Sequence, residues 1–257
     1  MGELHDLDWL NQHVGEDEEV SIRDVTDEIA ILAISGPSAR DVLQPLTAAD
    51  LSNGSFPWLT GQEIEIADVP CVALRVSYVG ELGWELHHTI DQMISLYTAL
   101  IDSGAAYDLS HYGSYAMNSM RIEKAYKAWG SELTTEITPI EARLERFVDL
   151  SRNFIGSDVV NERKSEKLDM VLVYCEVETN DTDCRGNEPI YVGDDLVGLT
   201  TSGTWSHTAG KSIAFAYVSP ELEASGSVFE IEIMNERCRA TVLKDAVVDP
   251  MNEKIRK

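Results

Sequence analysis

The stretch from Arg75 to Leu86, RVSYVGELGWEL, combines β-forming residues with two glycines. Glycines inside a β-rich run are expected where the backbone bends sharply or where a flat ligand approaches it closely. Tyr78 and Trp84 stand on either side of the two glycines. The stretch therefore predicts a bend within β-structure that has aromatic rings beside it.

The patterns on both sides of this stretch predict further strands and helices. The alternation at 63–66 and the β-rich run at 69–79 predict two strands that pair as a hairpin. Downstream, Thr89 begins a capping-box pattern, and apolar residues at helical spacing lead to Gly104 as a stop. We therefore expect a helix between these two residues.

Upstream of the hairpin, Ile29–Ile34 predicts a buried strand, and the turn Ser35–Ser38 predicts the start of a helix that ends near Leu46. The resulting order of strand, helix, strand, strand, helix is typical of an α+β ferredoxin-like unit. Helical patterns also occupy 4–10 and 114–128.

The wholly polar run 161–167 predicts a boundary between two domains, which would comprise residues 1–162 and 168–257. The second of these contains short strand patterns separated by turns, and it has little helix. We expect the strands to form a small all-β barrel or sandwich. They are predicted at 170–178, 189–192, 196–202, 211–218, 228–234 and 237–243.

Composition excludes several classes of protein. The 257 residues carry a formal net charge of -25, which repels the phosphates of nucleic acids. No apolar run reaches the roughly 18 residues of a membrane-spanning helix, so membrane insertion is not expected. The N-terminus has no targeting pattern, which favours a cytoplasmic location. The four cysteines lack the spacing of a zinc site, so we expect reduced thiols and no metal centre.

Glu85 is the candidate for binding a flat heterocycle. An ionised carboxylate accepts two parallel N–H bonds from a planar amidine-like edge, such as that of a pterin or guanine ring. Tyr78 and Trp84 are placed to stack on such a ring or to contact its edge. The alternative interpretation is a hairpin turn with a solvated glutamate, and the residues alone leave both open.

Two further segments contain functional side chains. In 121–130, Glu123 and Lys127 have the spacing of an ion pair on one helical face. The segment is thus either a solvated face with Trp129 as a core anchor or part of a site. Arg185 lies in a predicted loop and by itself indicates nothing more.

Taken in order, these segments resemble the folate-dependent aminomethyltransferase family, which includes the T-protein of the glycine cleavage system and the C-terminal halves of dimethylglycine and sarcosine dehydrogenases or oxidases. The resemblance spans nearly the whole chain and implies the fold of that family, a ferredoxin-like α/β unit followed by a small β-barrel. The residues from Tyr78 to Glu85 are most similar to the dimethylglycine-oxidising branch. The matching stretches are Ile34–Pro37, Arg75–Leu86, Arg121–Lys124, Trp129–Gly130, Thr138–Ala142, Arg185–Ile190, Val197–Gly203 and Gly210–Val218.

The resemblance implies a site in which tetrahydrofolate accepts a one-carbon unit from the methylene of an amine, in dimethylglycine, sarcosine or glycine catabolism. The family's folate-facing tyrosine and glutamate fall on Tyr78 and Glu85. A folate-facing arginine falls on Arg185, and Trp84 and Trp129 flank the implied site.

Two departures from the family pattern bear on activity. Met117 replaces an arginine of the glycine-cleavage branch, which favours the dehydrogenase-like branch. The family's longer N-terminal portion, which holds an aspartate thought to orient the folate, has no counterpart here, so no catalytic residue is assigned. The expected ligands are folate and a small amine-derived substrate. The alternatives are a non-catalytic folate-family scaffold, a partner subunit of a separate FAD-dependent oxidoreductase, and a relative that demethylates a sulfur compound.

The acidic residues are spread along the whole chain, and this distribution predicts a protein from a salt-rich cytoplasm, where counterions screen surface self-repulsion. The alternative is an ordinary acidic bacterial protein. On the first hypothesis the melting temperature, followed by circular dichroism, rises steeply from dilute buffer to molar KCl. A flat response would contradict it.

Overall fold

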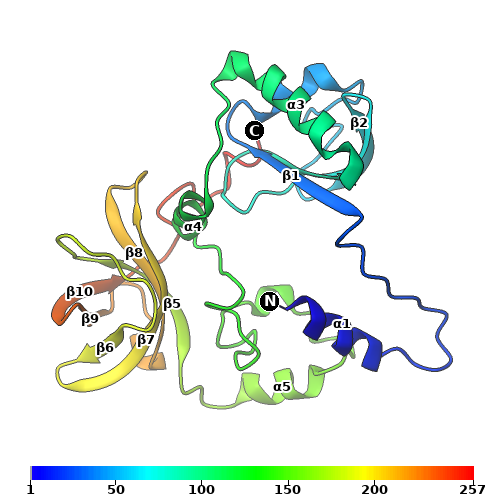
Figure 1. Ribbon diagram of the computed structural model, residues 1–257. Helices are drawn as coiled ribbons and strands as arrows, with labels where there is room; N and C mark the ends of the chain where they lie inside the picture. The colour runs from blue at the N-terminus through cyan, green and yellow to red at the C-terminus, as the bar shows by residue number, and fades with distance from the viewer. Residues whose placement is uncertain (1) are drawn as a thin grey trace. The chain divides into compact units, whose positions relative to one another are not determined.

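The computed structural model describes residues 2–257, which divide into two compact units (Figure 1). Unit 1 contains the residues up to Ser77 together with Leu82–Leu109, and unit 2 contains Tyr78–Glu81 together with Ser110–Lys257. The short segment Tyr78–Glu81 therefore belongs to unit 2, although the residues on both sides of it belong to unit 1.

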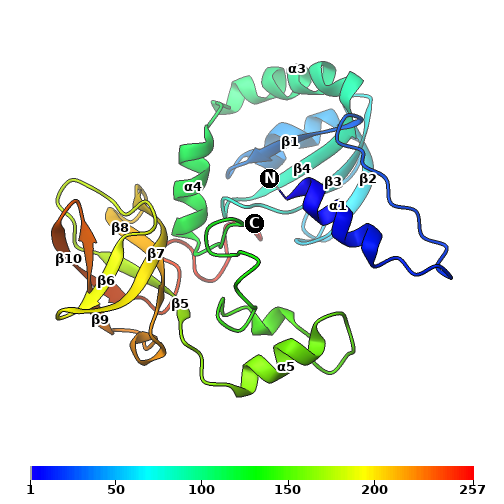
Figure 2. The ribbon, with the colours of Figure 1, turned by 60° about the horizontal axis from the view of Figure 1, so that its bottom comes forward.

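Unit 1 is built on a four-stranded antiparallel sheet. The strands lie in the order β1-β4-β3-β2, so β2, β3 and β4 form a meander and β1 pairs with β4. Figure 2 shows α3 running across the sheet. The elements are α1 (Glu3–Gln12), β1 (Ile29–Ser35), α2 (Ala39–Leu43), β2 (Gly61–Ile66), β3 (Val69–Leu74), β4 (Gly83–Thr89) and α3 (Met93–Gly104).

The two faces of this sheet differ in burial. Leu86 lies on the face covered by helices, where it is fully buried in one cluster with Leu96 of α3. On the opposite face Ile31 is 53% and Val72 is 45% exposed. The expectation of a buried strand at 29–34 is therefore wrong in one respect, because β1 is an edge strand with one open face.

The predicted hairpin is confirmed, and a third strand extends it. β2 and β3 are joined by Ala67 and Asp68, whose positive φ angles of 51° and 61° suit a tight hairpin turn. β3 ends at Leu74, earlier than predicted, and the chain returns to the sheet at Gly83. A Cβ atom at Gly83 would lie 2.6 Å from the carbonyl oxygen of Ile34, so glycine is needed for β4 to approach β1 here.

The helix predicted after this stretch is confirmed and ends at Gly104 as expected, but it begins later than predicted. It begins at Met93, and its N-cap residue Gln92 makes no capping hydrogen bond through its side chain. Gly104 keeps a right-handed backbone, and the left-handed residue is Asp108. Glycine is required at 104 by packing, because a Cβ atom there would lie 2.4 Å from the Leu109 side chain.

Unit 2 contains the predicted barrel. Six antiparallel strands close in the order β10-β5-β8-β7-β6-β9, and each coincides with a strand predicted from the sequence. The α+β class and the small C-terminal barrel are therefore confirmed. The elements are α4 (Ser114–Glu123), α5 (Ser157–Ser165), β5 (Val171–Val177), β6 (Pro189–Val192), β7 (Asp195–Ser206), β8 (Lys211–Val218), β9 (Val228–Ile233) and β10 (Glu236–Val242).

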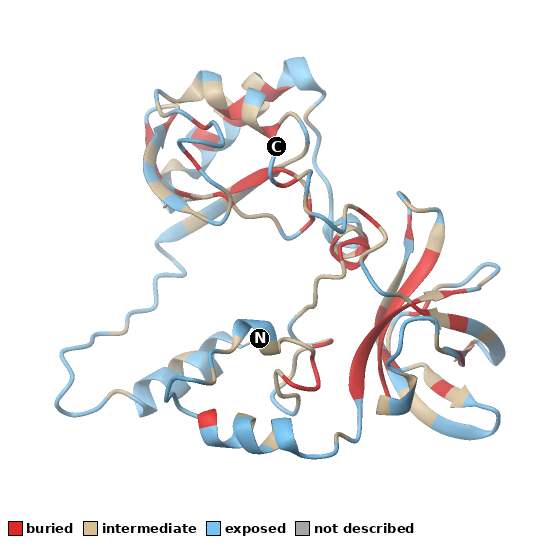
Figure 3. Ribbon diagram, turned by 180° about the vertical axis from the view of Figure 1, so that it is seen from behind, coloured by how far each residue is buried: buried red, intermediate tan, exposed pale blue. Residues whose placement is uncertain are grey.

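Two strands of the barrel, β5 and β8, are buried on both faces (Figure 3). One set of alternating side chains, including Val173 and Ala216, fills the barrel interior. The other set, including Tyr174 and Phe215, packs on the outside in one cluster with Ile122 of α4. The outer face of the barrel therefore holds α4 and the loop that follows it.

Two helical segments differ from their predicted limits. α4 ends at Glu123 instead of 128, and Ala125 then adopts a left-handed backbone with φ 54°. The polar run 161–167, predicted to be a domain boundary, largely forms the second half of α5. The boundary itself stays a prediction. No helix within residues 2–257 is long and apolar enough to cross a membrane.

Gly198 gives a test of barrel packing. A Cβ atom at this position would lie 2.2 Å from the Tyr217 carbonyl oxygen of the paired strand. Because backbone cannot yield as a side chain does, we expect Gly198→Ala to lower the free energy of unfolding by about 1–3 kcal/mol or more. Urea denaturation measures the change. Gly113→Ala is the matched control, since nothing lies within 4 Å of its Cβ position, and an equal loss in both variants would contradict this account.

Candidate functional site

Glu85 lies on the open face of the sheet in unit 1. Its side chain is 36% exposed, and its Oε2 atom lies 3.5 Å from Nε2 of His87, two residues further along the same face of β4. Apart from this long contact with His87, no contact of the Glu85 carboxylate with another side chain is found among residues 2–257. A half-buried carboxylate with one long contact keeps the capacity to accept hydrogen bonds from a ligand.

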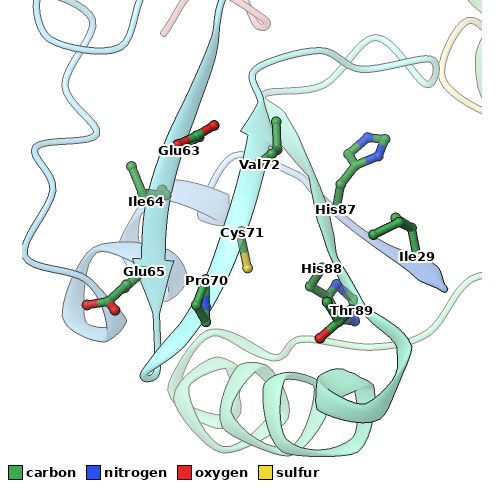
Figure 4. A pocket seen from close by; sticks show the side chains of 10 residues that line it. All are labelled: Ile29, Glu63, Ile64, Glu65, Pro70, Cys71, Val72, His87, His88 and Thr89. Carbon is green, nitrogen blue, oxygen red and sulfur yellow. The ribbon is translucent and has the colours of Figure 1, made fainter. Parts of the chain in front are cut away.

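A hollow of about 410 Å³ lies at the other end of the same face (Figure 4). It shares His87 with the neighbourhood of Glu85 but does not include Glu85 itself. In residues 2–257 no group of three His, Cys, Asp or Glu is arranged to hold a metal ion. The hollow is lined by Ile29, Glu63, Ile64, Glu65, Pro70, Cys71, Val72, His87, His88 and Thr89.

Trp84 points to the opposite side of β4 from Glu85, as expected for neighbouring residues on a strand. It is 1% exposed and packs edge-on against Phe56 at 6.2 Å between ring centroids. The guanidinium groups of Arg75 and Arg40 lie 5.5 Å and 5.8 Å from its ring centroid. Trp84 is therefore a core residue that fixes β4, and its ring is not presented to a ligand on the open face.

Tyr78 belongs to unit 2, where its hydroxyl donates a hydrogen bond of 3.2 Å to the backbone carbonyl of Lys127. Its ring stacks near Tyr126, with 6.5 Å between centroids. Partial burial raises the pKa of the Tyr78 hydroxyl, so it stays a neutral donor. At 38% exposure the ring retains a free surface.

The segment that carries Tyr78 is fastened within unit 2 by close packing and by an ion pair. Gly80 lies on the stem of Lys124, and a Cβ atom at Gly80 would be 2.1 Å from the lysine Cγ. Glu81 pairs with Lys254 at 2.6 Å. Lys124 is itself buried and pairs with Asp249 at 3.3 Å. The glycine of the predicted bend is thus explained by its approach to a buried lysine.

A fully buried ion pair joins α4 to the loop that follows it. Arg121 Nη1 lies 2.7 Å from Oε2 of Glu132, and both side chains are almost completely inaccessible. The same Oε2 accepts the Ala128 backbone N–H at 2.8 Å. Because a buried charge is costly unless it is paired and hydrogen-bonded, these contacts hold the loop in one conformation.

A β-bulge in β7 completes the surroundings of Glu132. The register of β7 against β8 shifts between Thr200 and Ser202, so consecutive residues there can face the same way. The hydroxyls of Thr201 and Ser202 both donate to Oε1 of Glu132, the former at 2.7 Å. The Tyr217 hydroxyl donates to the Glu132 backbone carbonyl at 2.7 Å.

Glu123 corrects the interpretation of 121–130 as a solvated face. It is 4% exposed, and its Oε1 accepts hydrogen bonds from the hydroxyl of Ser206 at 2.8 Å and the backbone N–H of Thr208 at 3.0 Å. The expected ion pair of Glu123 with Lys127 is not among the ion pairs of residues 2–257, since α4 ends at Glu123 and the helical spacing is lost beyond it. Trp129 is not a core anchor either, since it is 83% exposed.

Arg185 lies on a loop that is held by hydrogen bonds to the side chain of Glu188. The two carboxylate oxygens of Glu188 accept the backbone N–H groups of Arg185 and Gly186, at 2.8 Å and 2.9 Å. Gly186 has φ 126°, and a Cβ atom there would lie 2.6 Å from the Thr201 carbonyl oxygen. The loop therefore holds the exposed Arg185 beside the bulge that binds Glu132.

The predicted site residues thus fall in two groups. Trp84 and Glu85 belong to unit 1, on opposite faces of one strand, whereas Tyr78, Trp129 and Arg185 belong to unit 2. Sequence reasoning missed Glu132, because an isolated acid in a predicted loop carries no pattern that indicates burial.

Two family matches account for most of the chain. Residues 1–152 match the family described as GCVT N-terminal domain. Residues 171–249 match the glycine cleavage T-protein C-terminal barrel domain. The chain belongs to the folate-dependent aminomethyltransferase family. The family resemblance seen in the sequence is therefore confirmed.

The chain spans only part of the length of the relatives that it matches. It is 39% identical over 260 residues to human mitochondrial dimethylglycine dehydrogenase, covering 99% of the chain and 30% of that protein. It is 33% identical to an aminomethyltransferase of Thermoanaerobacter sp., covering 93% of the chain and 64% of that protein. The crystal structure of aminomethyltransferase T from Bartonella henselae has the same fold, with a TM-score of 0.84 at 22% identity, covering 97% of the chain and 67% of that structure.

Glu132 provides a test of this buried network. Its removal would leave the Arg121 guanidinium and the hydroxyls of the bulge without their acceptor. We expect Glu132→Ala to lower the free energy of unfolding by roughly 3–5 kcal/mol, the range for an uncompensated buried charge. Denaturant titration measures it. Glu136→Ala, in the same loop but exposed, should leave stability unchanged, and equal behaviour of the two variants would contradict the assignment.

Proposed function

We propose that the protein binds tetrahydrofolate and takes part in the transfer of a methylene group from an amine to this cofactor. The observation that carries the proposal is Glu85, a half-buried carboxylate on the open face of unit 1 whose one contact among residues 2–257 is the long one to His87 at 3.5 Å. Membership in a folate-dependent family supports it independently.

Glu85 fits the recognition edge of a pterin. The two oxygens of a carboxylate accept parallel N–H bonds from the ring N–H and the amino group of the pterin. The strand pairs of β4 with β1 and β3 fix the backbone of Glu85, opposite Ala33 and Leu74. The buried indole of Trp84 on the other face prevents the strand from rotating. The backbone that carries Glu85 is therefore fixed before a ligand arrives.

The other assignments come from unit 2 and follow the family resemblance. Tyr78 offers an exposed ring face while its hydroxyl is held by the Lys127 carbonyl. Arg185 offers an exposed guanidinium on an ordered loop, suited to a carboxylate of the folate. Trp129 offers an exposed indole for stacking.

Tetrahydrofolate, when bound, would supply the nucleophilic nitrogens that accept the methylene group from the amine. The residues named here bind and orient; none is assigned the proton transfer.

The donor and partner are proposed from the relatives. Dimethylglycine dehydrogenase acts, by its name, on a methylated amino acid, and this chain matches 30% of it. We therefore favour a donor of the dimethylglycine or sarcosine class, with glycine catabolism as the related alternative. A separate FAD-dependent oxidoreductase chain would supply the oxidised amine. A cytoplasmic location is part of this proposal.

A second candidate is a non-catalytic partner subunit. The exposed apolar side chains of Ile31 and Val72 on the open face of the sheet favour it, because such a face suits contact with another protein. Folate binding by the isolated chain distinguishes the two candidates, since a partner subunit without a folate site would give none.

Glu85→Ala is the direct test. Its loss leaves pterin N–H groups without an acceptor, so we expect tetrahydrofolate binding to weaken by about 1–3 kcal/mol. Titration in buffer of high KCl, followed by the fluorescence of the exposed Trp129 and by calorimetry, measures the affinity. Glu63→Ala is the control, because Glu63 is exposed on β2 of the same sheet.

Absence of tetrahydrofolate binding by the folded wild-type chain would contradict the proposed function. Equal affinities of the wild type and Glu85→Ala would retain folate binding but refute the role of Glu85.

A further inference from the structure

Segment 248–255 follows the last strand of the barrel and binds the end of α4. The backbone N–H of Val248 donates to the carbonyl of Glu123, the last residue of α4, at 3.2 Å. Within the segment, the side chain of Ile255 is 2% exposed. Residues outside helices and strands are poorly ordered unless other contacts tie them down. Segment 248–255 is therefore tied down by specific contacts, although it contains no helix or strand.

Asp249 determines the local fold of this segment. Asp249 and Asn252 have left-handed backbones, with φ angles of 46° and 58°, a conformation that Asp and Asn adopt more readily than most residues. The two carboxylate oxygens of Asp249 accept the backbone N–H groups of Glu253 at 2.8 Å and Lys254 at 3.1 Å. The segment thus folds back around a single carboxylate.

The buried Lys124 joins this segment to the one that carries Tyr78. Its ammonium donates to the Asp249 carbonyl and, at 2.9 Å, to Oδ1 of Asn252, and it pairs with the Asp249 carboxylate at 3.3 Å. Its aliphatic stem lies where a side chain at Gly80 would be, since a Cβ atom there would be 2.1 Å from the lysine Cγ. One side chain therefore contacts both segments.

Two further contacts reach the segment Tyr78–Glu81. Glu81 pairs with Lys254 of segment 248–255 at 2.6 Å, and the side chains are 19% and 39% exposed. The ring of Tyr78 stacks near Tyr126, whose ring centroid lies 6.0 Å from the Lys124 ammonium. Because Tyr78–Glu81 lies outside helix and strand, contacts of this kind hold it in place.

We propose that segment 248–255 positions Tyr78 for its ligand, with Lys124 and Lys254 as the positioning residues. The two lysines act through Gly80 and Glu81 and need not touch the ligand themselves. A flat ring gains from an aromatic side chain only at a short distance and in a suitable orientation, so a displaced Tyr78 would bind it less tightly. This inference rests on the proposed function, in which the ligand is tetrahydrofolate.

The ion pair of Glu81 with Lys254 gives the first test. Glu81→Gln and Lys254→Met each remove it, and Glu81→Lys combined with Lys254→Glu reverses its polarity. At the lowest KCl concentration that keeps the wild type folded, so that screening is weak, we expect each single variant to bind tetrahydrofolate roughly 2- to 5-fold more weakly by calorimetry. The combination of Glu81→Gln with Lys254→Met should bind no more weakly than either alone. The reversed pair should recover most of the affinity.

A spectroscopic measurement on the free protein reports the position of Tyr78 without any ligand. The protein is labelled with 3-fluorotyrosine, and the fluorine resonance of Tyr78 is assigned by its absence in Tyr78→Phe. We expect this resonance to shift or broaden in Glu81→Gln and Lys254→Met and to return in the reversed pair. The resonance of Tyr191, which lies on β6 of the barrel, is the internal reference.

An ion pair elsewhere in unit 2 is the matched control. Glu176 of β5 and Lys211 of β8 lie 2.7 Å apart, and both side chains are 35% exposed. Glu176→Gln and Lys211→Met should change the urea midpoint about as much as the variants at Glu81 and Lys254 do. They should leave the Tyr78 resonance and the tetrahydrofolate affinity unchanged. Equal changes in both sets would mean general loosening of unit 2 and would overturn the proposal.

Lys124→Met tests the buried contact. Methionine keeps an apolar stem beside Gly80 but removes the ammonium that binds Asp249 and Asn252. We expect tetrahydrofolate to bind about tenfold more weakly or worse, with a larger change in the Tyr78 resonance than at Glu81. If this variant does not fold, the partly exposed pair of Glu81 and Lys254 still decides the question.

The two measurements separate this inference from the proposed function. If the folded wild type does not bind tetrahydrofolate, the proposed function fails, and the Tyr78 resonance alone decides whether segment 248–255 positions this residue. If tetrahydrofolate binds equally well to the wild type and to every variant of the pair, the function stands and the positioning role is overturned. Additive losses of affinity in Glu81→Gln and Lys254→Met would also overturn it, because the two residues would then act separately.

Discussion

The carboxylate of Glu132 is the contact on which the candidate residues of unit 2 depend. Its side chain is inaccessible to solvent, and it binds Arg121 near the end of α4, the backbone of the following loop and two hydroxyls of a barrel bulge. The loop fixed in this way carries Lys127, whose carbonyl in turn holds Tyr78. One buried acid thus couples helix, barrel and the segment Tyr78–Glu81, because leaving any of its partners unpaired would be costly.

The barrel could be predicted almost residue by residue. Some of its strands alternate apolar and polar side chains, and others are short stretches of β-branched residues between turns. Both patterns are local properties of the sequence, so they can be recognised without knowledge of the fold. Closure of the six strands could not be read from the pattern, because a barrel and a sandwich bury the same alternating faces. The bulge in β7 was also invisible, since a shift of one residue leaves the strand pattern intact.

The candidate site was predicted less well than the fold. Neither tryptophan has the burial that its sequence context suggests: Trp84 lies in the core and Trp129 at the surface. Strand alternation could have assigned Trp84 and Glu85 to opposite faces, but which face is covered depends on packing of distant helices. The overlong prediction for α4 has a similar cause. Ala125 favours helix locally, but in the structure it is the residue that takes the left-handed backbone, between the buried carboxylates of Glu123 and Glu132.

The order of strands in unit 1 gives its two sheet edges different propensities to associate. A closed barrel has no unpaired strand, but in unit 1 both β1 and β2 are outermost. β2 carries the exposed charges of Glu63 and Glu65, which disfavour pairing of this edge with a strand of another molecule. Within β1 itself, Ile29–Ser35, every residue is uncharged, and Ile31 is exposed. Intermolecular strand pairing, and with it aggregation, would therefore begin along β1.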